Sequence, residues 1–574
     1  MIQYSLGSPF PSSRYIRVEA RFEVNEERSL ELQLPSWRPG RYELGNFAKN
    51  LRGLKAADDK GHPLQVAKTG KDRWVIRNAP SGIVTLTYEY YAAQPDAGAC
   101  WVDHELFYFN PVHCIIYDAE RMMEPVQIRL EVPDGWQIAC ALPSGGEKIL
   151  LAHNIHQLLD SPVMASLALR HRTYSVDDYQ FHIWIYGACR PDWDKILKDF
   201  EAFTSVQLET MGNFPVPEFH FMVMLLPYPF YHGVEHTSCT VLALGPGYKL
   251  MKPSMYSDFL GVASHELFHV WNVKTLRPAD FLEYDYTREN YSRLGWVYEG
   301  FTTYYGDLFL SRSGFFDSQD FFNELNVRLQ RHVDNHGFRF SSVAESSFDT
   351  WLDGYVAGAP ARKTSIYDEG CLIALMLDLY IRRTSNGKFS LDDLFVRLYD
   401  DFARRDKGYV ESDILRLAEH FSDQGVARIF IEAIHARSSY VELLEELLPV
   451  VGCVLSVQPS SLPHERYYGF RTVNEGSLTR VSAVLPDSPA ERVGISKDDE
   501  LLACNGWKVE GNLGDLIHLA EKECELIISS QKKINCLKLD VQERTWFDKV
   551  SIAKMSDADS AEKAFFEKWT GQKW

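Results

Sequence analysis

The first part of the chain alternates between apolar and polar residues with the period of two that half-buried strands show. The alternation is clearest in three stretches, residues 15–24, 30–34 and 83–88. Turn-forming residues separate these stretches, and no helix-period segment of useful length lies between them. The pattern therefore predicts an all-β domain over residues 1–168, built as a β-sandwich or a saddle-like sheet.

Beyond residue 170 the periodicity changes from two to that of helices. Two apolar strands are expected at 181–186 and 219–226, with an amphipathic helix over 192–211 between them. Residues 231–238 are expected to form a loop that leads into an edge strand over 240–244. From 256 to about 445 helical patterns dominate, for example over 319–335 and 367–383. A small sheet followed by many helices predicts an α+β catalytic domain over residues 169–445.

Short strands separated by Gly and Pro turns return after residue 446. The last stretch, 553–573, is charged and is expected to be helical. The fold class is therefore multidomain α+β, and we expect four segments: 1–168, 169–445, 446–545 and a helical tail over 546–574.

Composition and charge argue against several classes of partner and of metal site. The chain has 574 residues and a formal net charge of -19, which argues against nucleic acid or an anionic membrane as partner. No apolar run is long enough to span a bilayer, and the amino terminus lacks the pattern of a signal peptide. The ten cysteines are scattered without a Cys-x-x-Cys pair, so a cysteine zinc site is not expected. These features predict a cytoplasmic protein with reduced thiols; its oligomeric state is left open.

The sequence His265-Glu266-Leu267-Phe268-His269 lies in an apolar run and carries the chemistry of a zinc site. On a helix, His265 and His269 share one face, and Glu266 stands beside the metal where a general base for a bound water belongs. A chance match on an amphipathic helix is the alternative. However, a buried helix with these polar groups and no metal would carry expensive unsatisfied atoms.

A third ligand is needed, and Glu299 is the best candidate. The competing carboxylates, Glu283, Asp285 and Glu289, lie in a loop-like insert, whereas Glu299 lies in an apolar helical stretch. We therefore expect one Zn²⁺ per chain, held by two imidazoles and one carboxylate. Four polar residues are candidates for orienting these ligands: Asn272, Thr302, Thr303 and Asp307.

Together with Trp271-Asn272-Val273-Lys274 and Glu299-Gly300-Phe301, this motif resembles the glycyl aminopeptidase family of zinc metallopeptidases. That family belongs to the thermolysin-like (gluzincin) group, in which two His and one Glu bind the metal. The resemblance covers nearly the whole chain, and its amino-terminal part rests on Pro35-Ser36-Trp37-Arg38-Pro39-Gly40. It implies a thermolysin-like catalytic domain and an aminopeptidase that prefers small first residues such as Gly or Ala.

Two further segments resemble substrate-binding motifs of related aminopeptidases. The resemblance implies that Gly233 and Val234 pair with the substrate backbone, and that Glu235 binds the free α-ammonium by a charge-assisted hydrogen bond. It also implies that Tyr367 donates to the oxyanion. The relatives often carry Lys where this chain has Glu369. The structural alternatives are an acidic residue in an exposed loop and a buried tyrosine that only packs.

The carboxyl-terminal segment resembles a PDZ domain at three places, residues 467–471, 484–495 and 499–506. Such domains add a peptide strand to a sheet edge and bind its carboxylate with loop amides. A peptide carboxyl terminus is thus one expected partner. The sequence leaves open whether the module binds peptide or instead packs on the catalytic domain and shapes its cleft.

The predicted reaction is hydrolysis of the first peptide bond of peptides with a free amino terminus, with Glu266 as general base. Two alternatives remain open. One is a zinc endopeptidase with the same chemistry, in which Glu235 does not block the non-primed side. The other is a non-catalytic PDZ peptide-binding protein that keeps a relic metal site.

Overall fold

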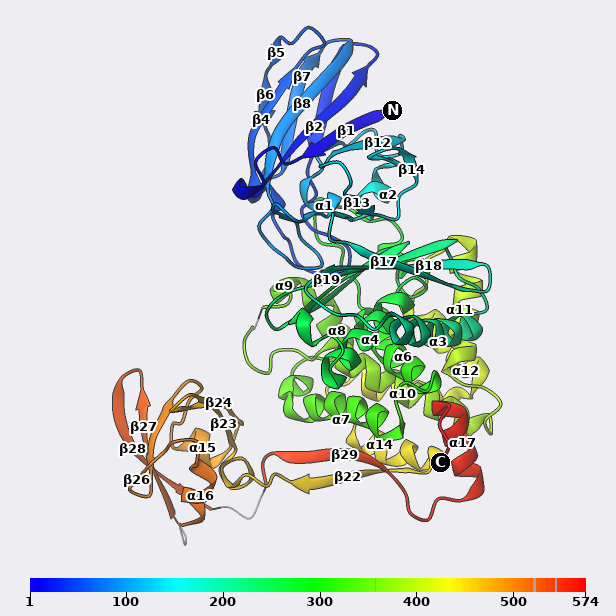
Figure 1. Ribbon diagram of the computed structural model, residues 1–574. Helices are drawn as coiled ribbons and strands as arrows, with labels where there is room; N and C mark the ends of the chain where they lie inside the picture. Colours follow the sequence, from blue (N-terminus) through cyan, green and yellow to red (C-terminus); the bar gives the residue numbers. More distant parts are fainter. Residues whose placement is uncertain (357, 520–522, 542–544) are drawn as a thin grey trace. The chain divides into compact units, whose positions relative to one another are not determined.

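The computed structural model describes residues 1–356, 358–519, 523–541 and 545–574. The chain forms two compact units. The first comprises Met1–Phe321, Gly337–Tyr440 and Ser560–Trp574, and the second comprises Phe322–His336 and Val441–Asp559. The expected order of a β-sheet domain, a helical region and carboxyl-terminal sheets is confirmed (Figure 1).

The amino-terminal region is built around an eight-stranded sheet in the order β14-β15-β12-β1-β2-β8-β4-β5. Six of its strands are β14 (Ser144–Gly146), β15 (Ile149–Ala152), β12 (Val126–Glu131), β1 (Ile2–Gly7), β4 (Leu51–Ala57) and β5 (Pro63–Leu64). Strand β2 (Tyr15–Val24) pairs antiparallel with β8 (Gly82–Tyr91) along its whole length. Every second side chain of β2, from Ile16 to Val24, is buried, as the period of two predicts. The helices of this region are short: α1 is Pro111–Cys114 and α2 is Ile155–Leu159.

A five-stranded mixed sheet follows in the order β17-β18-β19-β21-β20. Its strands are β17 (Arg170–Val176), β18 (Tyr179–Gly187), β19 (Glu218–Leu225), β21 (Cys239–Gly245) and β20 (Phe230–Glu235). The expectation of a loop over 231–238 and an edge strand over 240–244 is wrong. The edge strand is β20, whereas β21 lies between β19 and β20, and both of its faces are buried because α4 (Pro253–Phe268) and the amino-terminal region pack on them.

The helical region packs on one face of this sheet, and the amino-terminal region lies on the other (Figure 1). Tyr108 and Met164 of the amino-terminal region pack against Met222, Val241 and Ala243 of the sheet. Helix α3 (Trp193–Met211) connects β18 to β19, and α4 (Pro253–Phe268) contacts β20 and β21. The expected helices at 319–335 and 367–383 are α7 (Ser318–Asp334) and α10 (Ile366–Thr384).

Helix α6 (Gly300–Arg312) crosses α10 at very short range. A Cβ added at Gly300 would lie 2.3 Å from the Cα of Gly370, so glycine is required on both helices for this crossing. The remaining helices of the region include α5 (Gly295–Tyr298), α8 (Val343–Phe348), α9 (Thr350–Asp353), α11 (Leu391–Asp401) and α12 (Glu411–Phe421).

The second unit contains a six-stranded sheet in the order β23-β24-β25-β27-β28, with β26 paired to β25. Its strands are β23 (Phe470–Glu475), β24 (Leu478–Val484), β25 (Glu500–Cys504), β27 (Glu523–Ser530), β28 (Lys533–Asp540) and β26 (Trp507–Lys508). Two short helices accompany it, α15 (Pro489–Arg492) and α16 (Leu513–His518). The tail expected to be helical from residue 546 begins with a strand instead. β29 (Asp548–Lys554) pairs with β22 (Cys453–Pro459), and only Ser560–Thr570 forms a helix, α17.

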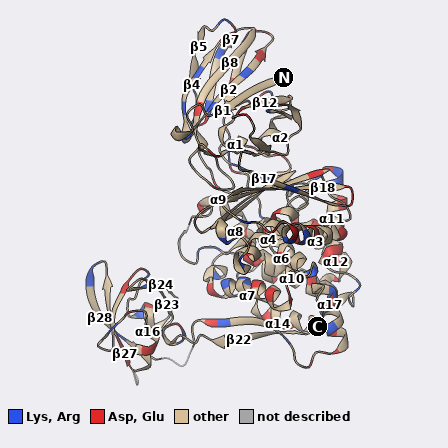
Figure 2. Cartoon of the chain, viewed as in Figure 1, with Lys and Arg blue, Asp and Glu red and all other residues tan. Residues whose placement is uncertain are grey.

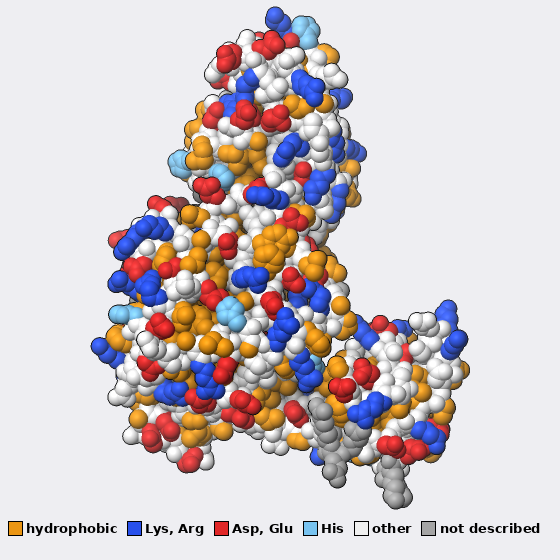
Figure 3. Space-filling model, turned by 180° about the vertical axis from the view of Figure 1, so that it is seen from behind, with side chains coloured by type: hydrophobic (Ala, Val, Ile, Leu, Met, Phe, Trp, Pro, Cys, Tyr) orange, Lys and Arg blue, Asp and Glu red, His pale blue; other side chains and the backbone are white. Residues whose placement is uncertain are grey.

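Acidic and basic side chains are distributed over strands and helices alike (Figure 2), and both signs are interspersed on the face shown in Figure 3. Within the described part of the chain, no helix combines the length and apolar character needed to cross a bilayer. All ten cysteines are free thiols.

Candidate active site

His265 lies in the last turn of α4, and His269 directly follows the end of that helix. The two Nε2 atoms are 3.1 Å apart, and His269 Nε2 lies 3.5 Å from Glu299 Oε2. One ligand atom from each of these three residues can be chosen so that all lie within 4.8 Å of one another. The structure therefore brings together the three residues that the sequence predicts as metal ligands. Glu283, Asp285 and Glu289 are not part of this group.

Glu299 occupies the break between α5 and α6 rather than the interior of a helix. Its Oε1 accepts a hydrogen bond from the hydroxyl of Tyr42 at 2.8 Å. Tyr42 belongs to the aromatic loop 35–42 of the amino-terminal region, for which the sequence allows either a substrate contact or a structural corner. Through Tyr42 the loop orients a candidate metal ligand. No local sequence pattern indicated this role of the loop.

The His269 imidazole is oriented by the backbone that follows α4. Its Nδ1 lies 2.8 Å from the carbonyl oxygen of Asn272, so Nδ1 carries the proton and Nε2 presents its lone pair toward Glu299. The Asn272 amide in turn donates to Thr302 Oγ1 at 3.0 Å. Thr303 donates to the backbone of Glu299. Asp307 is buried on α6. The backbone carbonyl of Asn272 thus contacts the imidazole of His269, and the hydroxyl of Thr303 contacts the backbone carbonyl of Glu299.

The electrostatics of this centre suit a divalent cation. Burial, reinforced by Glu235, raises the pKa of Glu299 well above its usual value, and burial with Glu235 and Glu299 does the same for the pKa of Glu266. Burial lowers the pKa of His269, which favours the neutral imidazole that a metal requires. Glu266 Oε2 is buried without a hydrogen-bond partner. Two imidazoles and one carboxylate are a ligand set that fits zinc. A bound cation would also relieve the repulsion between the neighbouring carboxylates Glu299, Glu266 and Glu235.

Strand β20 lies directly against Glu266. A Cβ added at Gly233 would be 2.2 Å from Glu266 Oε1 and 2.7 Å from Val262 Cγ2, so only glycine allows this approach. Val234 turns its side chain into the core, and its carbonyl accepts a hydrogen bond from Thr240. Because β20 is the edge strand, its other side has no partner strand among the described residues.

Glu235 ends β20 and is buried beside the base and the second imidazole. Ligand atoms of Glu235, Glu266 and His269 can be chosen within 4.8 Å of one another. On its outer side Glu235 meets the amino-terminal loop, where a Cβ added at Gly40 would lie 2.4 Å from Glu235 Oε2. Gly40 has φ +81°, a conformation that also favours glycine. The predicted substrate-binding strand therefore lies alongside the candidate metal site.

Tyr367 lies in the first turn of α10, and its hydroxyl is 3.1 Å from that of Tyr355. A hydrogen bond from Tyr367 lowers the pKa of Glu299, which burial otherwise raises. The pKa of Tyr367 is itself raised by burial and by the nearby charge of Glu299, so the phenol keeps its proton. Tyr355 was not nominated from the sequence, because it lies in an irregular segment without any motif.

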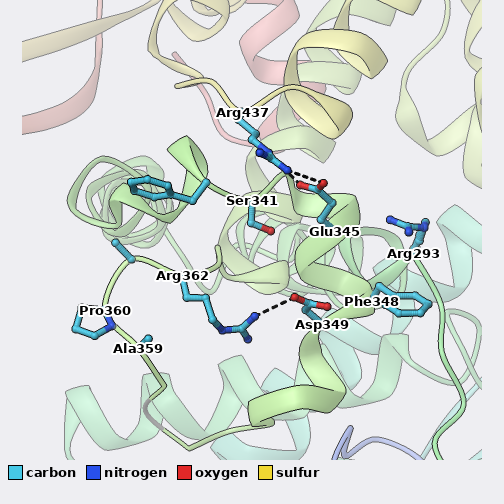
Figure 4. Close-up of a pocket in the computed structure, with 11 residues that line it drawn as sticks. Arg293, Ser341, Glu345, Phe348, Asp349, Ala359, Pro360, Arg362 and Arg437 are labelled. Carbon is cyan, nitrogen blue, oxygen red and sulfur yellow. Dashed lines mark hydrogen bonds and ion pairs between the residues drawn. The ribbon is translucent and has the colours of Figure 1, made fainter.

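The segment that carries Tyr355 is held in place by ion pairs around a cavity of about 650 Å³ (Figure 4). Arg362 donates to Asp349 at 2.9 Å and to Asp353 at 2.6 Å, which ties both ends of α9. On the opposite wall Arg437 donates to Glu345 at 2.8 Å. These carboxylates are each paired with an arginine, so they add no free carboxylate to the site.

Asp160, which directly follows α2, links three segments around the site. It accepts hydrogen bonds from Lys274 Nζ at 2.8 Å and from Thr237 Oγ1 at 2.6 Å, and it lies 3.1 Å from His236 Nδ1. Lys274 and His236 hold its pKa far below the usual range despite burial. Lys274 follows Val273, whose φ of +122° is strained for a β-branched residue. Sequence reasoning missed Asp160, since only the fold brings it to these partners.

Two family models match separate parts of the chain. The Peptidase M61 N-terminal domain matches residues 3–167, and M61 glycyl aminopeptidase matches residues 258–373. A search of curated proteins finds no match.

Solved structures were compared with the whole chain. The aminopeptidase N family protein from Idiomarina loihiensis shares the fold, with a TM-score of 0.90 at 24% identity, and the match covers 99% of this chain and 100% of that one. An M1 zinc metallopeptidase from Deinococcus radiodurans has a TM-score of 0.46 at 14% identity, over 76% of this chain and 94% of its own.

Proposed function

Since the chain belongs to the M61 glycyl aminopeptidases, which are zinc metallopeptidases, we propose that it removes a small first residue, Gly or Ala, from peptides with a free amino terminus. The family and the enzyme class expected from the sequence motifs are thereby confirmed. The roles of the individual residues are part of the proposal.

His265, His269 and Glu299 would hold the metal, with one zinc ion per chain. When bound, zinc supplies Lewis acidity toward the scissile carbonyl and lowers the pKa of the attacking water. Tyr42 and the Asn272 carbonyl orient the ligands, and their hydrogen bonds at 2.8 Å support this assignment.

Glu266 acts as the general base: it takes the proton of the water and passes it to the leaving amine. Its position beside the candidate metal ligands and its unpartnered buried oxygen support this role. Tyr367 donates to the developing oxyanion, and its retained proton supports that step. Gly233 and Val234 align the substrate backbone along the open side of β20.

One observation carries the aminopeptidase proposal: Glu235 lies beside Glu266 and His269, with ligand atoms within 4.8 Å. An ammonium bound to Glu235 would therefore lie about one residue from the reacting carbonyl, given about 3.3 Å per extended residue. A peptide that continued past this point would bury a carboxylate with no cation opposite it. The position of Glu235 thus favours cleavage of the first bond over cleavage within the chain.

The test compares Gly-p-nitroanilide with its N-acetylated form in the wild type, Glu235→Gln and the control Glu283→Gln. We expect cleavage of the free amine only, loss of most activity in Glu235→Gln and no change in Glu283→Gln. Equal cleavage of the acetylated substrate would support the endopeptidase instead.

Metal analysis of the purified protein tests the proposal of one zinc ion per chain. No hydrolysis by the zinc-loaded wild type, with unchanged peptide capture by Glu266→Gln, would support a relic site.

For the carboxyl-terminal region we propose a PDZ-like module over residues 446–545, following 1–168 and 169–445 and preceding the tail 546–574. Tyr468 and Phe470 are buried in its core, and Gly469, with φ +72°, ends the helical turn His464–Tyr468 directly before edge strand β23 (Phe470–Glu475), which supports a tight turn at the start of that strand. Residues 520–522 and 542–544 lie outside the described part. Binding of a free peptide carboxyl terminus is tested by titration with labelled peptides and their amides.

We further propose a cytoplasmic location and peptides as partners, without nucleic acid or membrane. Ten free thiols support the reducing compartment. Fractionation of cells that express the native chain would test it.

A further inference from the structure

The loop that supports the metal ligands also buries a guanidinium without a carboxylate. Arg38 is only 4% exposed. Its hydrogen bonds are long: 3.3 Å to the carbonyl of Pro39 and 3.4 Å to His232 Nε2. Over the described residues no carboxylate forms an ion pair with it. A buried arginine is normally paired, because an uncompensated buried charge is costly. Arg38 is therefore a site prepared for an anion.

The fold makes room for this side chain and gathers further cations beside it. A Cβ added at Gly98 would lie 2.3 Å from Arg38 Nη2. Arg38 lines a cavity of about 200 Å³ together with Arg41 and Lys49. Lys49 is exposed on the rim.

The two carboxylates of this cavity are already engaged. Glu43 pairs with Arg41, and Asp96 accepts a hydrogen bond from the backbone of Gly98 at 2.8 Å. Asp96 also accepts from Gln94. Arg38 and Lys49 thus remain available to a ligand of opposite charge.

Arg38 connects this cavity to the edge strand of the site. Arg38 contacts His232, which precedes the glycine that covers Glu266. Arg41 lies 5.2 Å above the ring of Tyr355, whose hydroxyl meets Tyr367. A peptide with its ammonium at Glu235 that follows β20 would reach His232 after three strand residues. At about 3.3 Å per residue this is about 10 Å, the length of an extended tripeptide.

We propose that Arg38, with Arg41 and Lys49, binds the terminal carboxylate of a tripeptide substrate. The enzyme would then read both ends of a short peptide. This inference rests on the proposed function, because it takes Glu235 as the place of the amino terminus. A planar guanidinium suits a carboxylate by two parallel hydrogen bonds.

The test measures kcat/KM for Gly-Ala-Ala and for Gly-Ala-Ala-amide. We expect the wild type to prefer the free carboxylate about tenfold or more, as a charge-assisted hydrogen bond provides. Arg38→Gln and Lys49→Gln should each reduce this ratio, and the exposed control Lys60→Gln should leave it unchanged. The ratio is the readout because Arg38 also lies near enough to Glu266 to lower its pKa.

A ratio near one in the wild type, or an unchanged ratio in both variants, overturns the inference while the aminopeptidase stands. If the zinc-loaded wild type cleaves neither peptide, the proposed function itself fails. Lys49→Gln keeps the test valid if Arg38→Gln does not fold, since Lys49 is exposed.

Discussion

Gly233→Ala tests how closely the edge strand covers the general base. The new Cβ would lie 2.2 Å from Glu266 Oε1 and 2.7 Å from Val262 Cγ2, whereas ordinary carbon contacts begin near 3.4 Å. Glu266 or β20 must therefore move by about 1 Å, since either the carboxylate or the strand has to give way. A displacement of this size costs about 100-fold in rate. Overpacking costs about 1–3 kcal/mol of stability.

The chain offers a matched control in helix α4. A Cβ at Gly261 meets nothing within 4 Å, so Gly261→Ala should leave kcat/KM unchanged. It should also stabilise the helix by about 0.5–1 kcal/mol. The assay is hydrolysis of Gly-p-nitroanilide with zinc content and thermal unfolding measured in parallel. If Gly233→Ala binds zinc, folds and retains kcat/KM within twofold of the wild type, then β20 does not lie as close to Glu266 as inferred.

Three further variants test the supports of the site. Tyr42→Phe removes the hydrogen bond to Glu299, so zinc affinity measured by competition with a chelator should fall about tenfold; unchanged affinity would refute the support. Tyr367→Phe should lower kcat about 100-fold or more with little change in KM, as loss of an oxyanion donor does; a change in KM alone would argue against it. Asp160→Asn leaves Lys274 buried without its partner and should cost about 3–5 kcal/mol by denaturant unfolding, whereas Asp134→Asn, at an exposed ion pair, should leave the stability essentially unchanged. Because the folded pKa of Asp160 is depressed, its contribution is present above the unfolded pKa of about 3.9 and is lost as pH falls below it; a gap between wild type and variant that widens in acid would contradict this.

Local patterns were enough to predict the strands of the first region and the helix with its two imidazoles. β2 buries every second residue, and α4 presents His265 and His269 toward Glu299, as their spacings require. The edge strand was misplaced because β20 alternates poorly. Its glycine and its exposed Tyr231 resemble a loop, and only the pairing with β21 defines it.

Two of the residues that sequence reasoning missed, Tyr42 and Asp160, act through contacts distant in the chain. Tyr42 bonds a residue of a different region, and Tyr355 lies in a segment without periodicity. Asp160 bonds residues that only the fold brings near. No window of sequence contains both partners of such pairs. The domain boundaries and the PDZ-like module remain predictions.

The hydrogen bonds of Tyr42 and Asp160 make the active site depend on both the amino-terminal β region and the helical region. Both residues precede position 169, yet one holds a candidate ligand and the other bonds the chain on either side of α4. A fragment that begins at 169 would expose Lys274 without its carboxylate and leave Glu299 without its phenol. Recombination or truncation at this boundary would therefore separate halves of one active site, so the β region must be inherited together with the helices it serves.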